Sequence, residues 1–183
     1  MSALIAAIVI GAGSLWLALR ELPLADRIVA GPWQTAIATG SPDADPYTRT
    51  WIALNGLLAL NRSETVYFMA TADSAGQPLD GACRYTLQGP ALPARWWSIT
   101  AYAPDRFLIP NPQNAYSEGA TTVTPDAAGT WRIALQPAAT DGAWIATAPG
   151  PFALTLRLYN PTDAAQADLA AMPFPAIIRE GCP

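Results

Sequence analysis

The sequence predicts an all-β antiparallel sandwich of the jelly-roll kind, preceded by one amphipathic helix and an N-terminal transmembrane helix. Three observations lead to this fold class. The stretch after Met1 is uncharged and apolar, several later segments alternate apolar and polar residues, and 18 prolines with 13 glycines mark frequent turns. Strands do not alternate with helices, so a doubly wound parallel sheet is not expected. We therefore divide the chain into an anchor over residues 1–20, a linker over 21–45 and a β domain with its leading helix over 46–183.

Composition excludes several classes of function. The 183 residues carry a net charge of −4, and their ten basic residues are all arginine. No basic stripe is available for nucleic acid, which is not an expected partner. The chain contains no histidine, so it can form neither a Ser-His-Asp nor a Cys-His catalytic group, nor a histidine metal site. We expect no cofactor, no metal and no catalytic residues.

The N-terminal stretch is the predicted membrane anchor. Residues 2–19 are uncharged and would rise about 27 Å as a helix, against a hydrocarbon core of about 30 Å. A cleaved signal peptide is the alternative, but no Lys or Arg precedes the stretch and no small-x-small cleavage site follows it. Ala3, Ala7 and Gly11 recur every four residues, which predicts a smooth ridge where a second helix docks. Abundant Ala and Gly would produce the same spacing without a docking role.

The next segments are the linker and the leading helix. Residues 21–45 contain several prolines and glycines and few apolar residues, as expected of a spacer over the domain surface. Asp45-Pro46 is a typical helix start, and it predicts a helix over about 46–60. Its apolar face, Trp51-Leu54-Leu58, is too short to cross a bilayer, so we expect it to lie on the β domain.

Five segments are predicted to be strands, the first from its β-rich composition and the other four from alternation of apolar and polar residues. They cover residues 65–71, 83–88, 96–102, 131–136 and 152–159. In the last of them Leu154, Leu156 and Leu158 share one face and Arg157 lies on the other. Trp96 and Trp97 are adjacent on one strand, so only one of them can point into the core.

Several motifs together resemble a known family. They are Asp45-Pro46-Tyr47, the run 56–64, Pro78-Leu79-Asp80-Gly81, the run 96–102, Asn111-Pro112 with Tyr116-Ser117, and Gly150-Pro151-Phe152 continuing into 156–161. In order and spacing they resemble the domain of unknown function 1214 family, over roughly residues 46–179. The resemblance implies a jelly-roll-like β-sandwich, here in a short, membrane-anchored bacterial form. Ala115 stands where many members have arginine, so any ligand role of that arginine is not expected here.

The two cysteines are expected to form a disulfide. Cys83 lies in a predicted strand and Cys182 next to the C-terminus, and the short form of the family carries cysteines near both places. The bond would stabilise the fold by about 4 to 5 kcal/mol. Two free thiols in a cytoplasmic domain, or a redox pair, are the alternatives. With the anchor, the disulfide predicts a single-pass inner-membrane protein, N-terminus in the cytoplasm and C-terminal domain in the periplasm.

One polar cluster is a candidate ligand surface. It comprises Tyr102, Asn111, Asn114, Tyr116 and Ser117, whose aromatic and amide groups suit a sugar, although Asn-Pro turns more often serve structure alone. Arg157, opposite the core face of its strand, is expected either to receive an anionic ligand or to pair with an acid such as Asp126 or Asp141.

Three hypotheses of function follow. The first is a non-catalytic accessory subunit that stabilises an inner-membrane protein complex, contacting the bilayer and other subunits through the N-terminal helix. The second is a periplasmic module that binds a glycan or small ligand. The third is a carboxylate-based hydrolase, which needs two acids about 5 to 10 Å apart in a cleft, a spacing that the sequence does not indicate.

Overall fold

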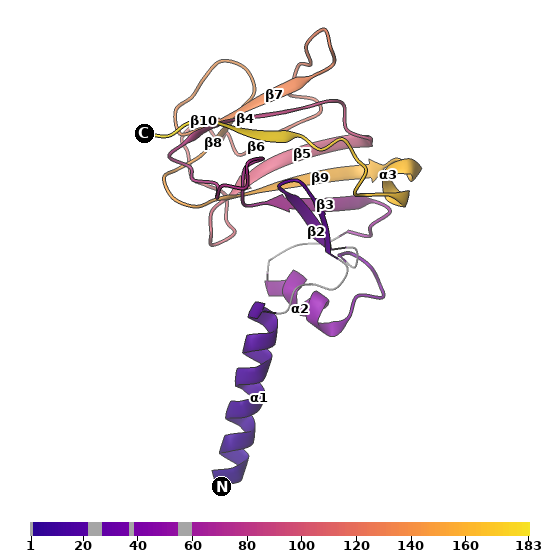
Figure 1. Ribbon diagram of the computed structural model, residues 1–183, viewed down its shortest axis with the longest axis vertical. Helices are drawn as coiled ribbons and strands as arrows, with labels where there is room; N and C mark the ends of the chain where they lie inside the picture. The colour runs from indigo at the N-terminus through magenta and orange to yellow at the C-terminus, as the bar shows by residue number, and fades with distance from the viewer. Residues whose placement is uncertain (1, 22–26, 37–38, 55–59) are drawn as a thin grey trace.

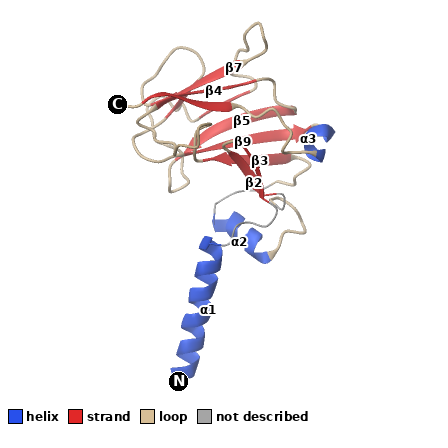
Figure 2. Ribbon diagram, viewed as in Figure 1, coloured by secondary structure: helices blue, strands red, loops and turns tan. Residues whose placement is uncertain are grey.

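Two open β-sheets make up most of the molecule (Figures 1 and 2). The structure, a computed structural model, describes residues 2–21, 27–36, 39–54 and 60–183. The larger sheet has six strands in the order β1-β2-β3-β9-β5-β6 and the smaller has four in the order β10-β4-β7-β8. All strand pairs are antiparallel except β7 with β8. A mostly β fold of two antiparallel-rich sheets is thus confirmed.

The strands of the larger sheet come from distant parts of the chain. They are β1 (Arg27–Ala30), β2 (Trp33–Ala36), β3 (Thr65–Ala70), β9 (Ala153–Pro161), β5 (Ala94–Tyr102) and β6 (Ser117–Gly119). The smaller sheet comprises β10 (Ala176–Gly181), β4 (Arg84–Gly89), β7 (Trp131–Gln136) and β8 (Trp144–Ala146). β9 lies between β3 and β5 and pairs with both along most of its length. It is therefore the central strand of the larger sheet.

The core lies between the two sheets. Leu154, Leu156 and Leu158 of β9 are fully buried, as are Ile133 and Leu135 of β7. Burial of this kind stabilises the fold by about 1.5–3 kcal/mol for each large apolar side chain. The period of two along each strand puts the intervening residues on the outer faces.

The adjacent tryptophans of β5 lie on opposite faces of the strand, as predicted. Trp97 is 5% exposed and its ring lies 4.5 Å from that of Trp131 on the opposite sheet. Trp96 is 36% exposed and packs on Tyr159 of the neighbouring strand. The pair therefore fixes which face of β5 is the core face.

The predicted linker differs from the structure. Residues 27–36 form a hairpin, β1 and β2, that extends the larger sheet next to β3. Trp33 is fully buried, and its indole N–H donates to the carbonyl of Pro175 at 2.7 Å. This hairpin was missed because its strands have only four residues each, too few for a clear alternation, and follow the turn residues that indicated a spacer.

Three helices complete the described chain. α2 (Pro46–Leu54) begins as predicted, because the Asp45 carboxylate accepts a hydrogen bond from the Thr48 amide at 3.1 Å. The side chains of Trp51 and Leu54, and residue Leu58, lie outside the described part, so the predicted apolar face stays a prediction. α3 (Asp163–Ala167) is short and capped by Thr162.

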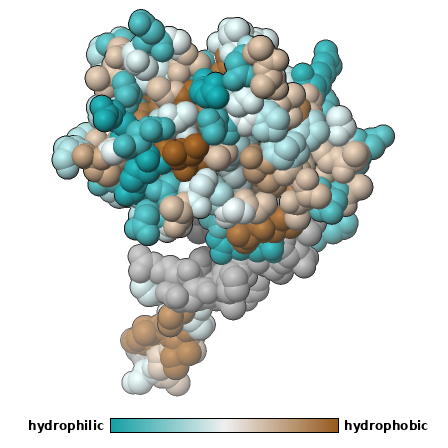
Figure 3. All heavy atoms as spheres, turned by 45° about the horizontal axis from the view of Figure 1, so that its top comes forward, coloured by the Kyte–Doolittle hydropathy of each residue, from teal (hydrophilic) through white to brown (hydrophobic). Residues whose placement is uncertain are grey.

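The N-terminal helix, α1 (Ser2–Glu21), extends away from the two sheets in Figure 1. Ala3, Ala7 and Gly11 all lie on it and are exposed, and so are Leu4 and Ile5. The apolar side chains of α1 appear as brown spheres projecting from the domain in Figure 3. Helix docking along this ridge stays a prediction.

The predicted localisation needs correction. In the part of the chain that the structure describes, no helix combines the length and the apolar character needed to cross a bilayer. Arg20 and Glu21, which follow the uncharged stretch, occupy the last turn of α1. The prediction of a single-pass inner-membrane protein with a periplasmic domain is therefore wrong on this finding.

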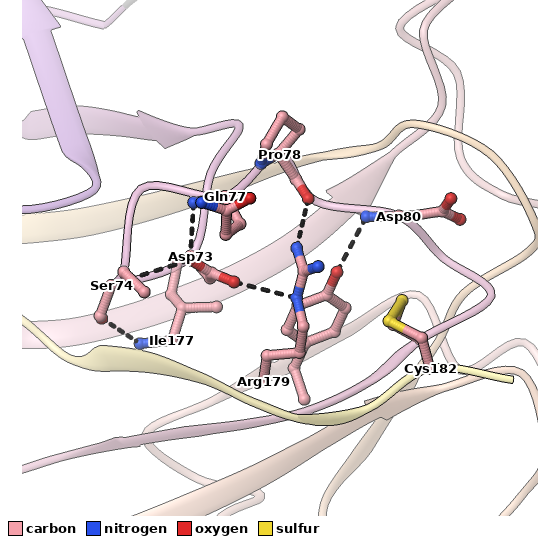
Figure 4. A network of polar contacts seen from close by, with 11 residues as sticks. Asp73, Ser74, Gln77, Pro78, Asp80, Ile177, Arg179 and Cys182 are labelled. Carbon is pink, nitrogen blue, oxygen red and sulfur yellow. Dashed lines mark hydrogen bonds and ion pairs between the residues drawn. A yellow bond between two sulfur atoms is a disulfide. The ribbon is translucent and has the colours of Figure 1, made fainter.

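A disulfide, an ion pair and a hydrogen bond hold the C-terminal strand. Cys83 and Cys182 form a disulfide, as expected, so β10 is tied covalently to the residue before β4. Arg179 of β10 pairs with Asp73 at 3.0 Å, and the Ser74 hydroxyl accepts a hydrogen bond from the Ile177 amide at 2.9 Å (Figure 4). These contacts fix an edge strand that pairs with β4 alone.

Candidate functional site

An apolar hollow of about 580 Å³ lies on the outer face of the larger sheet. Met69 of β3, Tyr102 of β5, and Thr155 and Arg157 of β9 line it. Thr155 lies opposite Met69 on one side and Thr100 on the other, so the central strand pairings set the spacing of this floor. The outward position of these residues follows from the inward position of the leucines of β9.

Three loops form the walls. The first contributes Thr71, Ala72, Pro78 and Leu79, the second Ala103, Pro104 and Arg106, and the third Pro151 and Phe152. The first and third walls are joined, because the Asp80 carboxylate accepts hydrogen bonds from the amides of Ala82 at 2.9 Å and Gly150 at 3.0 Å. Gly81 is needed at this junction, since a Cβ there would lie 2.0 Å from the carbonyl oxygen of Ala148. The wall is therefore fixed by backbone contacts.

Asp80 should make this junction sensitive to acid. Hydrogen bonds from the amides of Ala82 and Gly150, with a smaller contribution from the charge of Arg179, lower the pKa of the Asp80 carboxyl below its usual value of 3.8. A carboxyl group whose pKa is lower in the folded state stabilises the fold above the unfolded pKa, and this stabilisation is lost as the pH falls through the folded pKa. We expect stability to fall below pH 3.8, and Asp80→Asn to reduce that fall. Urea unfolding midpoints between pH 6 and pH 2.5 measure it, and equal acid slopes for the two proteins would contradict the assignment.

Arg157 is the ionised group on the floor of the hollow. Its guanidinium donates to the hydroxyl of Thr100 at 3.2 Å and to that of Tyr102 at 2.7 Å, and it lies 5.5 Å from the centre of the Tyr102 ring. The predicted pairing with Asp126 or Asp141 does not occur, because the described ion pairs join Arg132 to Asp126 and Arg179 to Asp73. Arg157 therefore has hydroxyl and aromatic neighbours in place of a carboxylate.

The five residues of the predicted ligand surface do not line one site in the structure. They are Tyr102, Asn111, Asn114, Tyr116 and Ser117. Tyr102 alone lines the apolar hollow. Asn111 holds the turn after it, since its amide group donates to the Ile109 carbonyl at 3.1 Å and accepts from the Ala115 amide at 2.8 Å. Asn111 thus has the structural role that Asn-Pro turns usually have.

The remaining three predicted residues lie elsewhere. The Tyr116 hydroxyl donates to the side-chain carbonyl of Asn114 at 3.1 Å, and Asn114 and Ser117 line a second, polar hollow of about 810 Å³. A ligand role for these residues stays a prediction.

The polar hollow is larger, but its arginine, Arg132, is already paired with Asp126, and the other charged residues of its described lining, Glu118 and Asp141, are acids. Glu118 accepts a hydrogen bond from the Trp144 amide at 3.2 Å, and Asp126 pairs with Arg132 at 2.9 Å. Paired charges give a ligand less electrostatic attraction than the unpaired guanidinium of Arg157 does. We therefore take the apolar hollow as the candidate site.

Two further observations bear on its chemistry. Among the described residues, no three His, Cys, Asp or Glu side chains cluster closely enough to hold a metal ion. The described lining of the apolar hollow contains no acidic residue, and acid-based hydrolysis of a sugar needs two. The charged residues of the described lining are two arginines, Arg106 and Arg157.

Part of this site could be predicted from the sequence. The alternation in β9 shows that Arg157 points away from the core, and Tyr102 was among the predicted residues. The walls were missed because they come from three loops that meet only through tertiary contacts, such as that of Asp80 with Gly150.

The fold and the hollow define a β protein of two open sheets with an apolar hollow on the outer face of the larger one. The chain belongs to the family described as "Protein of unknown function (DUF1214)", whose model matches residues 64–163. None of the curated proteins matches the chain.

Two solved structures are similar to it. The VPA0106 protein from Vibrio parahaemolyticus is 26% identical with a TM-score of 0.63, over 92% of this chain and 42% of that protein. A putative uncharacterised protein from Burkholderia cenocepacia is 17% identical with a TM-score of 0.47, over 63% of this chain and 29% of that protein. This chain therefore spans less than half the length of either.

Proposed function

We infer that this protein is a non-catalytic module that binds a small molecule in the apolar hollow of the larger sheet. The observation that carries this proposal is a concave, mostly apolar site of about 580 Å³ with one convergent group of polar side chains, Arg157, Thr100 and Tyr102. Small-molecule sites in proteins have this composition and volumes of about 300–1,000 Å³. A jelly-roll-like arrangement of the two sheets belongs to the same proposal, supported by the repeated passage of the chain between the sheets from β3 to β10.

The fixed walls support the same conclusion. A binding site gains affinity when its shape exists before the ligand arrives, because less conformational entropy is lost on binding. Here the Asp80 carboxylate and the close approach of Gly81 to Ala148 hold two walls together. The floor is held by strand pairing on both sides of β9.

The test is to fill the hollow. Ala153 lines it from β9, so Ala153→Trp should weaken binding of the neutral fluorescent probe N-phenyl-1-naphthylamine by about tenfold, equivalent to about 1.4 kcal/mol. Probe fluorescence in a titration of the full chain measures the affinity, and circular dichroism checks that the variant is folded.

The matched control is Ala134→Trp. Ala134 is a partly buried residue of β7 that lines the polar hollow, so this variant adds the same side chain and leaves the apolar hollow open. Both variants keep α1, so any probe bound by its exposed apolar residues contributes equally to the two titrations. Equal affinities of the wild type and Ala153→Trp would contradict the proposal.

An accessory-subunit role is the second candidate, and α1 supports it. Ile8, Val9 and Ile10 are each more than 60% exposed, and an exposed apolar surface of this kind is typical of a partner-binding element. Purification with a stoichiometric partner that is lost on removal of α1 would favour this role.

A further inference from the structure

We propose that the ligand is an amphipathic organic anion, with a carboxylate head at Arg157 and Tyr102 and an apolar body along the walls of the hollow. This inference rests on the proposed function and specifies the class of molecule that the hollow takes. It is carried by the charge of the lining, the uncommitted hydrogen-bond donors at Arg157 and the position of the apolar walls.

The charge of the described lining is positive. It includes Arg106 and Arg157 and no Asp or Glu. A cation in a partly apolar hollow favours an anionic ligand, since the attraction is stronger there than in bulk water.

The hydrogen bonds at Arg157 leave donors for that anion. A guanidinium has five N–H donors, and Arg157 directs one to Thr100 and one to Tyr102. Both hydroxyl oxygens act as acceptors in these bonds, so the O–H of Tyr102 is oriented away from the guanidinium and remains a donor. A carboxylate beside Arg157 would therefore accept charge-assisted bonds from the guanidinium and one from Tyr102.

The neighbouring strands hold the guanidinium in this position. Arg157 lies opposite Ser98 in the pairing of β9 with β5, and its side chain reaches along β5 to Thr100 and Tyr102. Contact with the Tyr102 ring, at 5.5 Å from its centre, further restricts the side chain. A preorganised cation loses little entropy when it binds an anion.

The apolar part of the hollow extends from this group. Met69, Leu79, Pro104, Pro151 and Phe152 line it together with Pro78. These six side chains offer no hydrogen-bond partner stronger than the thioether sulfur of Met69, which suits a hydrocarbon body and disfavours a glycan. An apolar chain with a carboxylate at one end matches the two halves of the site.

The experiment compares three ligands of equal chain length that differ in the head group: decanoate, decanol and decylamine. Each displaces N-phenyl-1-naphthylamine from the full-length protein at pH 7.5, and Ala153→Trp defines the signal that does not come from the hollow. We expect decanoate to bind about tenfold more tightly than decanol, as a charge-assisted hydrogen bond implies, and decylamine to bind most weakly.

Arg157→Met should weaken decanoate binding by about tenfold and leave decanol within about twofold, since it removes the charge and keeps an apolar stem. Arg132→Met, which removes an arginine from the polar hollow, should leave both unchanged. Binding of decanoate no tighter than that of decanol, with both lost in Ala153→Trp, would overturn the anion inference and keep the proposed function. Displacement that is insensitive to Ala153→Trp for all three would overturn both.

Discussion

Removing the disulfide, with Cys83 replaced by alanine and Cys182 by serine, should lower the free energy of unfolding by about 4 kcal/mol. The bond joins residues that are 99 positions apart, and in the chain-entropy account a cross-link over such a loop restricts the unfolded chain strongly. Alanine suits position 83 because Cys83 is 4% exposed, and a serine hydroxyl there would be buried without a designed partner. A loss of this size is a large part of the 5–15 kcal/mol typical of a domain.

Urea unfolding followed by tryptophan fluorescence measures the change. The wild type in excess reductant should lose nearly the same free energy as the double variant, and the variant itself should not respond to reductant. If the reduced wild type keeps its stability, the cross-link does not contribute to equilibrium stability, and the noncovalent contacts of β10 alone hold the C-terminal strand.

The parts of the fold that were predicted are those in which one strand shows its own pattern. β9 alternates leucines with polar residues along most of its length, and β7 alternates Trp131, Ile133 and Leu135 with partly exposed neighbours. In such strands the sequence period equals the structural period, so each side chain is assigned to a face without knowledge of the rest of the chain.

The parts that were missed depend on partners elsewhere in the chain. β8 has three residues and β6 has three, which is too short to show a period. Trp33 of the β1–β2 hairpin donates its indole hydrogen bond to the carbonyl of Pro175, which lies far away in the sequence. The apolar hollow likewise needs three loops at once, and only Tyr102 and Arg157 could be selected in advance because both lie on strands.

Asp73→Ala should destabilise the protein by about 3 kcal/mol, because it breaks a buried ion pair and removes the acceptor of a tight turn. Asp73 is 2% exposed in its side chain, against 29% for its partner Arg179. Its carboxylate also accepts hydrogen bonds from the amides of Ala75 at 3.0 Å and Gln77 at 2.9 Å. The contact of the Arg179 Nε with Asp73 is one of opposite charges at 3.0 Å without the geometry of a hydrogen bond, so most of its contribution is electrostatic.

Asp73→Asn separates the two contributions. Asparagine keeps a carbonyl oxygen that can accept from the amides of the turn, but it removes the charge that faces Arg179. We therefore expect Asp73→Asn to lose some stability, but less than Asp73→Ala loses. Equal losses for asparagine and alanine would show that the charge alone stabilises this corner.

A second turn in the same chain serves as a control for the effect of burial on the ion pair. The turn that starts at Asp126 repeats the turn at Asp73: each aspartate accepts hydrogen bonds from amides two and four residues later, each turn has a glycine with positive φ at its fourth position, and each carboxylate pairs with an arginine. The two differ in exposure, because Asp126 is 39% exposed and its partner Arg132 is 56% exposed. Water screens such a pair, and exposed pairs contribute little.

Asp126→Ala should therefore cost much less stability than Asp73→Ala, measured as urea midpoints under identical conditions. Because the backbone bonds of the two turns match, the difference between the two losses reflects the two ion pairs, of which the Asp73 pair is more buried and the Asp126 pair is exposed and hydrogen-bonded. Similar losses at both positions would mean that the turn hydrogen bonds, present in each, stabilise the protein and that burial of the Asp73 pair adds nothing. A larger loss of stability at Asp73 would show that an ion pair holds β10 in addition to the disulfide of Cys182. These two links would then explain how an edge strand with one neighbouring strand stays in the smaller sheet.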